Sequence, residues 1–285
     1  MSDFTDASSI DKAMGVMKGE AVFKFQNVNV TLPLITSSQA TQGNAVVNFP
    51  IYPQITSGQV DGTESGKSTM RKITASDRQV KIDQKSTHTT VADVAYFGGA
   101  NVGADLGAIM GNAVAQKFDL DVCALFADFS QTQGGASTQI TLTHLFDAMR
   151  MIKSAGGIAP FSFVSNAKGI YGGKGLRPLL LDTSAVTGFS NTTPAEEFAS
   201  TGFVTQIGLT GVYHSEGVIE DGSNDNPSGM FAKGAIVCAI GSQGLVNIET
   251  ERDAVVGGFH IVGRGYYGVG EGQDSHGVLI THDVS

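Results

Sequence analysis

Two glycine-rich segments carry letters that are typical of nucleotide-binding loops. The first, Gly62-Thr-Glu-Ser-Gly66-Lys67-Ser68, has three residues between its glycines where a phosphate-binding loop needs four. It also leads into a polar strand, so no helix N-terminus would face a phosphate. The second, Gly263-Arg-Gly-Tyr-Tyr-Gly268, matches the dinucleotide fingerprint, but only residues 269–285 follow it, too few for a strand–helix–strand unit. We expect neither segment to bind a nucleotide, and we expect no cofactor.

Side chains that bind metals or act as nucleophiles occur without the spacing that such chemistry needs. The histidines show no His-Glu-x-x-His pattern, and no Cys-x-x-Cys pair or Gly-x-Ser-x-Gly elbow is present. Cys123 and Cys238 lie in apolar surroundings, which predicts buried, reduced thiols. The histidines are His88, His144, His214, His260, His276 and His282.

One acidic segment could bind an ion. Residues Asp221–Asn226 offer oxygen ligands for calcium, but the same composition is typical of a solvated turn, which we prefer. Because no acid–base or nucleophilic constellation is visible, the sequence favours a structural protein that is not an enzyme. A hydrolase whose site only an alignment would expose remains an alternative.

Composition limits the surface and its partners. Hydrophobic residues make up 41% of the chain and charged residues 16%, so much of the surface could face other copies. The net charge of −9 argues against a general nucleic-acid-binding face. No signal peptide and no apolar run long enough to span a membrane is visible. The 37 glycines and the absence of Trp indicate many turns.

A long helix is the strongest element that the pattern predicts. From Gly103 to Phe129, apolar residues recur in steps of three and four, and no proline interrupts them. At 1.5 Å per residue such a helix would span about 40 Å, which suits a structural spine. The apolar positions are Leu106, Ile109, Met110, Ala113, Val114, Phe118, Val122, Leu125, Phe126 and Phe129.

The other elements indicate an α+β protein that is rich in strands. Residues 1–43 form a polar arm, and residues 44–86 form a hairpin whose strands are too polar for a core. Shorter helices are predicted at 143–155 and 167–171, and a polar loop at 221–227. Strands are predicted at 161–165, 204–209, 211–214, 235–240, 246–250, 260–267 and 277–282.

This order of elements resembles the fold shared by tailed-bacteriophage major capsid proteins, encapsulins and herpesvirus shell proteins, the Johnson fold. Gly43-Asn-Ala-Val-Val-Asn-Phe-Pro50 and Val60-Asp-Gly-Thr-Glu-Ser look like the opening strand and the acidic tip of that family's extended loop. Arg71-Lys-Ile-Thr-Ala-Ser-Asp-Arg-Gln-Val-Lys-Ile82 resembles the returning strand. The similarity continues through residues 89–94, 119–127, 203–215, 247–253 and 259–268.

The resemblance implies a domain plan and a function. It implies an N-terminal arm at 1–43, an extended loop at 44–86, a peripheral domain at 87–138 and 245–285, and an axial domain at 139–244. It also implies assembly with itself, as pentamers and hexamers, into an icosahedral shell in the host bacterial cytoplasm. The shell would form with scaffold and portal proteins, with or without decoration proteins, and enclose phage double-stranded DNA in the virion without sequence-specific binding.

Charged residues on the hairpin and near the end of the chain are the candidate intersubunit contacts. A long isolated two-stranded ribbon is marginal in water, so the hairpin needs a surface to lie on. The candidates are Lys67, Arg71, Lys72, Arg78, Lys81, Glu249, Glu251 and Arg252. An encapsulin-like compartment and a β-rich phage tail or adhesion protein remain alternatives, although the second leaves the spine helix unexplained.

Overall fold

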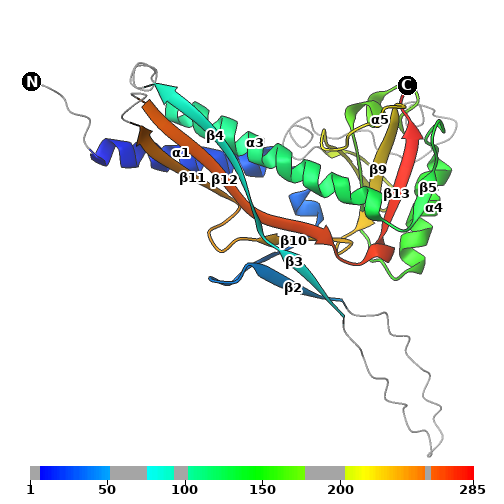
Figure 1. Cartoon of the computed structure of the whole chain (residues 1–285). Coiled ribbons are helices and arrows are strands. Elements are labelled where there is room, and N and C mark those ends of the chain that lie inside the picture. Colours follow the sequence, from blue (N-terminus) through cyan, green and yellow to red (C-terminus); the bar gives the residue numbers. More distant parts are fainter. Residues whose placement is uncertain (1–6, 52–75, 93–101, 177–202, 254–257) are drawn as a thin grey trace, which may run out of the picture.

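A computed structural model describes residues 7–51, 76–92, 102–176, 203–253 and 258–285. Two sheets make up most of the body, and helices α1 (Ala7–Val28) and α3 (Val102–Ala124) lie together along the longer sheet (Figure 1). Helix α4 (Leu142–Ser154) packs against the other sheet. The α+β class is therefore confirmed.

Helix α3 is the predicted spine. It continues as the 3₁₀ turn η2 (Leu125–Asp128), so the helical stretch matches the prediction for 103–129 closely. Its inner face is buried at Met110, Val114, Phe118 and Val122. The predicted apolar face is wrong at Ile109, which is 65% exposed.

Helix α1 replaces most of the expected polar arm. Met17, Ala21 and Phe25 are buried against α3 and the longer sheet, so this part of the expected arm is a helix packed on the body. A Cβ atom on Gly107 would lie 2.9 Å from Met17 Cα, and one on Gly111 2.7 Å from Ala21 Cα. Because real Cβ atoms do not approach so closely, glycine at these positions is what lets the two backbones touch.

A buried carboxylate holds the end of α1 on α3. Asp119 accepts hydrogen bonds from Asn29 Nδ2 at 3.0 Å, from the Val30 amide at 3.1 Å and from Thr31 through its amide and its hydroxyl at 3.1 and 2.6 Å. Burial raises the pKa of Asp119, and the bonds from Thr31 and Val30 oppose that shift. The contacts Met17–Gly107, Ala21–Gly111 and Asn29–Asp119 advance together, so the helices run parallel.

The longer sheet has five strands built around β12 (Gly258–Glu271). Strands β4, β10 and β11 each pair antiparallel with β12. Strand β1 pairs with β10 in parallel. The remaining bounds are β1 Thr36–Gln39, β4 Asp83–Ala92, β10 Ile236–Ile240 and β11 Val246–Asp253, with the 3₁₀ turn η1 at Leu32–Leu34.

The other sheet has six strands in the order β5-β13-β9-β6-β8-β7. It includes β13 (Gly277–Asp283), while β10 belongs to the longer sheet. The expected boundary between the axial and peripheral domains at residues 244 and 245 therefore does not coincide with the division of the strands between the two sheets. The remaining bounds are β5 Thr132–Gly134, β6 Phe161–Ser165, β7 Phe203–Ile207, β8 Thr210–His214 and β9 Asp225–Ala232, with α5 at Ala167–Tyr171 and η3 at Asp274–His276.

Strand β9 lies inside the six-stranded sheet although its sequence predicts a loop. The polar loop expected at 221–227 extends only to residue 224, because Asp225 begins the strand. Pro227 is tolerated because it lies where β9 pairs with β13, beyond the stretch paired with β6.

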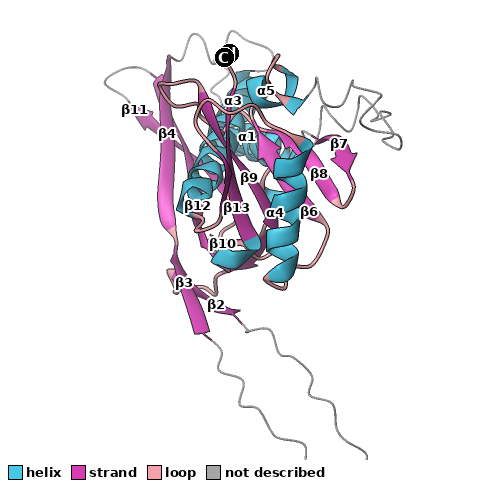
Figure 2. Ribbon diagram, turned by 90° about the vertical axis from the view of Figure 1, so that its right-hand side faces the viewer, coloured by secondary structure: helices cyan, strands magenta, loops and turns pink. Residues whose placement is uncertain are grey.

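The hairpin of β2 (Val46–Ile51) and β3 (Ser76–Lys81) projects from the body (Figure 2). Its strands are not wholly polar, so that expectation is wrong. Phe49 and Val80 are buried against Val237 and Ala239 of β10. The base of the hairpin is therefore part of the core.

We expect Gly111→Ala to destabilise the fold by about 1–3 kcal/mol, because the added methyl must push α1 away from α3. Gly19→Ala is the matched control, since a Cβ there would meet nothing within 4 Å. In a helix interior that change should stabilise by about 0.5–1 kcal/mol. Urea unfolding of both variants measures the difference. Equal effects would show that the helices do not touch at Gly111.

We expect Phe118→Ala to cost about 3–5 kcal/mol, because Phe118 is fully buried and contacts both Phe25 and Tyr267. Leu106 and Leu125 are only partly buried, so Leu125→Ala should cost less. Ile109→Ala is the control and should change the melting temperature little. A neutral Phe118→Ala variant would contradict this assignment of the core.

Candidate functional site

A buried polar cluster lies at the ends of β6 and β13, beside the start of β9. Asn226 Nδ2 donates to Ser165 Oγ at 2.8 Å and to Asn166 Oδ1 at 3.0 Å, and the Ser228 hydroxyl donates to Ser165 Oγ at 2.8 Å. His282 is fully buried beside these groups. Ser165 is also fully buried and makes no hydrogen bond to His282 among the described residues. The cluster stabilises the sheet and offers no accessible nucleophile.

His282 is a neutral imidazole in this environment. Burial lowers its pKa to about 4 and His144 lowers it further, while a backbone hydrogen bond at Ile280 and the carboxylates of Asp225 and Asp283 oppose the shift. Protonation of His282 would place a charge inside the sheet, where the cost of burial exceeds what these neighbours return.

The other groups considered for chemistry are engaged or buried. Cys123 and Cys238 are free and buried as predicted, and burial raises the pKa of both thiols. In the acidic loop, the Asp221 carboxylate accepts hydrogen bonds from the Ser223 and Asp225 amides at 2.8 and 2.9 Å. This carboxylate therefore stabilises the turn in which it lies. Within the described ranges, no three His, Cys, Asp or Glu side chains gather as metal ligands.

The candidate intersubunit residues fall into two separate groups. Arg78 and Lys81 lie on β3, and Glu249 and Glu251 lie on β11, so the structure does not bring them into one site. Glu249 pairs with Arg264 at 2.7 Å and Lys81 with Asp83 at 3.7 Å. Lys67, Arg71 and Lys72 lie outside the described residues, as does the side chain of Arg252.

Arg78 binds the hairpin to the body of its own subunit. Its guanidinium donates to the Glu271 carbonyl at 3.0 Å and to the Glu271 carboxylate at 2.9 Å. Burial raises the pKa of Glu271, the adjacent Asp274 raises it further, and Arg78 opposes both. Asp274 in turn accepts from the Ser130 amide at 2.8 Å and from its hydroxyl. Sequence patterns did not point to Glu271 or Asp274, because both contacts join segments that are distant in the chain.

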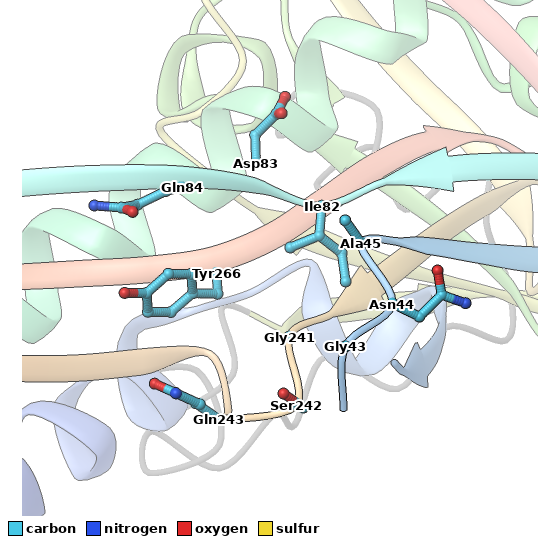
Figure 3. Close-up of a pocket in the computed structure, with 10 residues that line it drawn as sticks. All are labelled: Gly43, Asn44, Ala45, Ile82, Asp83, Gln84, Gly241, Ser242, Gln243 and Tyr266. Atoms are coloured by element: carbon cyan, nitrogen blue, oxygen red, sulfur yellow. The ribbon is translucent and has the colours of Figure 1, made fainter. Parts of the chain in front are cut away.

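An open cleft of about 370 Å³ lies at the root of the hairpin (Figure 3). Ile82, where β3 passes into β4, donates its amide to the Ala45 carbonyl at 2.8 Å. Tyr266 and Gln243 lie on the other side of the cleft. The cleft thus lies beside the point where the hairpin joins the body.

No helix in the part of the chain that the structure describes is long and apolar enough to cross a membrane. Neither a protein-family model nor a curated protein matches the sequence.

Solved structures that match this chain include capsids and a virus-like particle. The capsid of cyanophage P-SCSP1u matches with a TM-score of 0.63 and 16% identity, over 88% of this chain and 87% of that one. The head of Helicobacter pylori bacteriophage KHP40 matches at 0.66 and 11% identity, over 91% of each chain. A virus-like particle from Pyrococcus furiosus matches at 0.61 and 10% identity, over 94% and 98%. The chain has the fold of capsid shell proteins, and in particular that of phage capsids.

We expect the folded protein to lose about 2 kcal/mol of stability between about pH 7 and pH 5 through His282 alone. Because the folded pKa lies below the unfolded value near 6.5, this stability is present above about pH 6.5 and is lost as the pH falls toward 4. Thermal melting across this range should show a flatter pH dependence for His282→Leu. His88→Gln, which changes an exposed histidine, is the control and should keep the wild-type slope. An unchanged slope in His282→Leu would contradict the assignment.

Proposed function

We propose that the chain is the major capsid protein of a tailed bacteriophage. In this proposal it assembles as pentamers and hexamers into an icosahedral shell around double-stranded DNA. The observation that carries the proposal is the likeness to phage capsid and head structures over nearly the whole chain. The buried, structural use of Ser165 and His282 supports a structural protein rather than an enzyme.

The two sheets and the hairpin support an assignment of the subunit's domains. The α1–α3 layer and the longer sheet would form the peripheral domain, and the six-stranded sheet with α4 the axial domain near the centre of each ring. The projecting hairpin would be the extended loop that lies over a neighbouring copy. Lys67, Arg71, Lys72, Arg78, Lys81, Glu249, Glu251 and Arg252 would supply intersubunit contacts, with Arg78 also holding the hairpin to its own body.

The charge of the chain supports enclosure of DNA without tight binding. Displacing counterions from phosphates needs clustered cations, and the chain carries a net charge of −9. A wall of this kind would let DNA enter and leave. Scaffold, portal and decoration proteins would be further partners, with assembly in the host cytoplasm and the product in the virion.

We expect the expressed chain, with the scaffold and portal of its own phage supplied where needed, to form megadalton particles in sedimentation and closed shells in electron microscopy. Repetition of one set of interfaces under closed symmetry gives this outcome. A persistent monomer under all these conditions would contradict the proposal. Particles filled with one protein cargo would favour an encapsulin-like compartment, and fibres would favour a tail or adhesion protein.

A further inference from the structure

A groove with apolar walls lies between α4 and the turn that joins β7 to β8. Its volume is about 660 Å³, within the range of pockets that bind other molecules. Phe146, Met149 and Leu209 provide apolar walls, and the exposed Arg150 and Lys153 also line it. Phe146 is 50% exposed and Leu209 45%, whereas Leu145, Ala148 and Ile152 on another side of α4 are buried in the core. The groove is therefore an apolar surface additional to the core-facing side of α4.

A second exposed apolar feature stands on the loop after β8. Ile219 is 62% exposed although its neighbour Val218 is buried. The loop is held firmly. Glu220 accepts from Lys168 Nζ at 2.7 Å and from Asn166 Nδ2 at 3.2 Å, and a Cβ on Gly217 would lie 2.7 Å from the backbone of Asp119. A loop whose backbone is already held loses little conformational entropy when a partner covers it.

The two features are complementary in charge. Arg150 and Lys153 line the groove, with Asp147 already paired to Arg150 at 3.3 Å. The loop of Ile219 carries two exposed acids, Glu216 and Asp221. Glu216 lies 2.7 Å from His214 Nε2, and Asp221 Oδ1 accepts two backbone amides, so each acid keeps a second carboxylate oxygen for a partner. In a chain with 18 cations and 27 acids, two cations at an apolar groove favour a partner with acids beside an apolar side chain.

The two features also lie at opposite ends of one strand. Leu209 precedes β8 and the Ile219 loop follows it, so the groove and the loop are separate surfaces of the subunit. A contact between unlike surfaces is heterologous and closes into a ring when the rotation allows. We propose that Ile219 of one copy inserts into the α4 groove of the next copy in the same ring, an inference that rests on the proposed function. The partner is a second copy of this chain.

A disulfide between the two surfaces tests the contact. Leu209→Cys and Ile219→Cys, introduced together, should cross-link neighbouring copies in assembled particles, since a disulfide needs Cα atoms about 4.4–6.8 Å apart. Both native cysteines are buried and will not interfere. On a non-reducing denaturing gel, oxidised particles should give a ladder up to the pentamer and hexamer. Leu209→Cys with Ile109→Cys is the matched control, because Ile109 is 65% exposed on α3, and should give no ladder.

Charge reversal provides a second measurement on the same double-cysteine chain. Lys153→Glu should lower the cross-linking yield several-fold, and Glu216→Lys added to it should restore most of that yield.

The outcomes separate this inference from the proposed function. A ladder in the double variant alone supports the contact. Normal particles without a ladder would overturn it and leave the shell function standing. Cross-linked dimers from Ile219→Cys alone would indicate a two-fold contact and would also overturn it. If the unmodified chain forms no particles under the same conditions, the proposed function fails and this inference fails with it.

Discussion

The direct contact between the backbones of α1 and α3 is the constraint on which the rest of the structure depends. It exists because Gly107 and Gly111 present no Cβ to α1, and it is fixed along the helix axis by the four hydrogen bonds that Asp119 accepts from residues 29–31. The separation and the axial position of the two helices are thus set independently. Together they form one layer, whose buried side chains, including Phe118 and Met110, pack against β12 and β11.

The longer sheet gives the projecting hairpin a firm base. The backbone of Lys81 passes over Gly268 of β12, where any Cβ would collide with its carbonyl oxygen. Strand β4 pairs with β12 from Asp83 onward, whereas β3, just before it, crosses the sheet. Phe49 and Val80 of the hairpin therefore reach β10. Arg78 closes the arrangement through Glu271. The hairpin therefore leaves the body in a defined direction, which is what a contact with another copy requires.

Local patterns predicted the elements well, while the partners of those elements lay beyond the sequence. The spine helix followed from apolar steps of three and four, which depend on residues near in sequence. Helix α1 was missed as a core element because its partner lies about 90 residues later in the chain. Strand β9 was missed because the polar residues up to Pro227 are typical of a turn, yet β13 and β6 supply its pairing. The contact of Arg78 with Glu271 depends on the same kind of distant pairing.

The net charge and the placement of the cations both affect how copies of such a subunit could associate. Copies that each carry −9 repel one another at long range, but at about 0.15 M salt the screening length is only about 8 Å. Short-range matches between unlike patches can then outweigh the repulsion. The described cations suit this purpose, because Arg78 and Lys81 lie on the hairpin and Arg150 and Lys153 line the α4 groove. Exposed pairs contribute only about 0–1 kcal/mol each, so single contacts would stay reversible and allow misplaced subunits to leave before a ring closes.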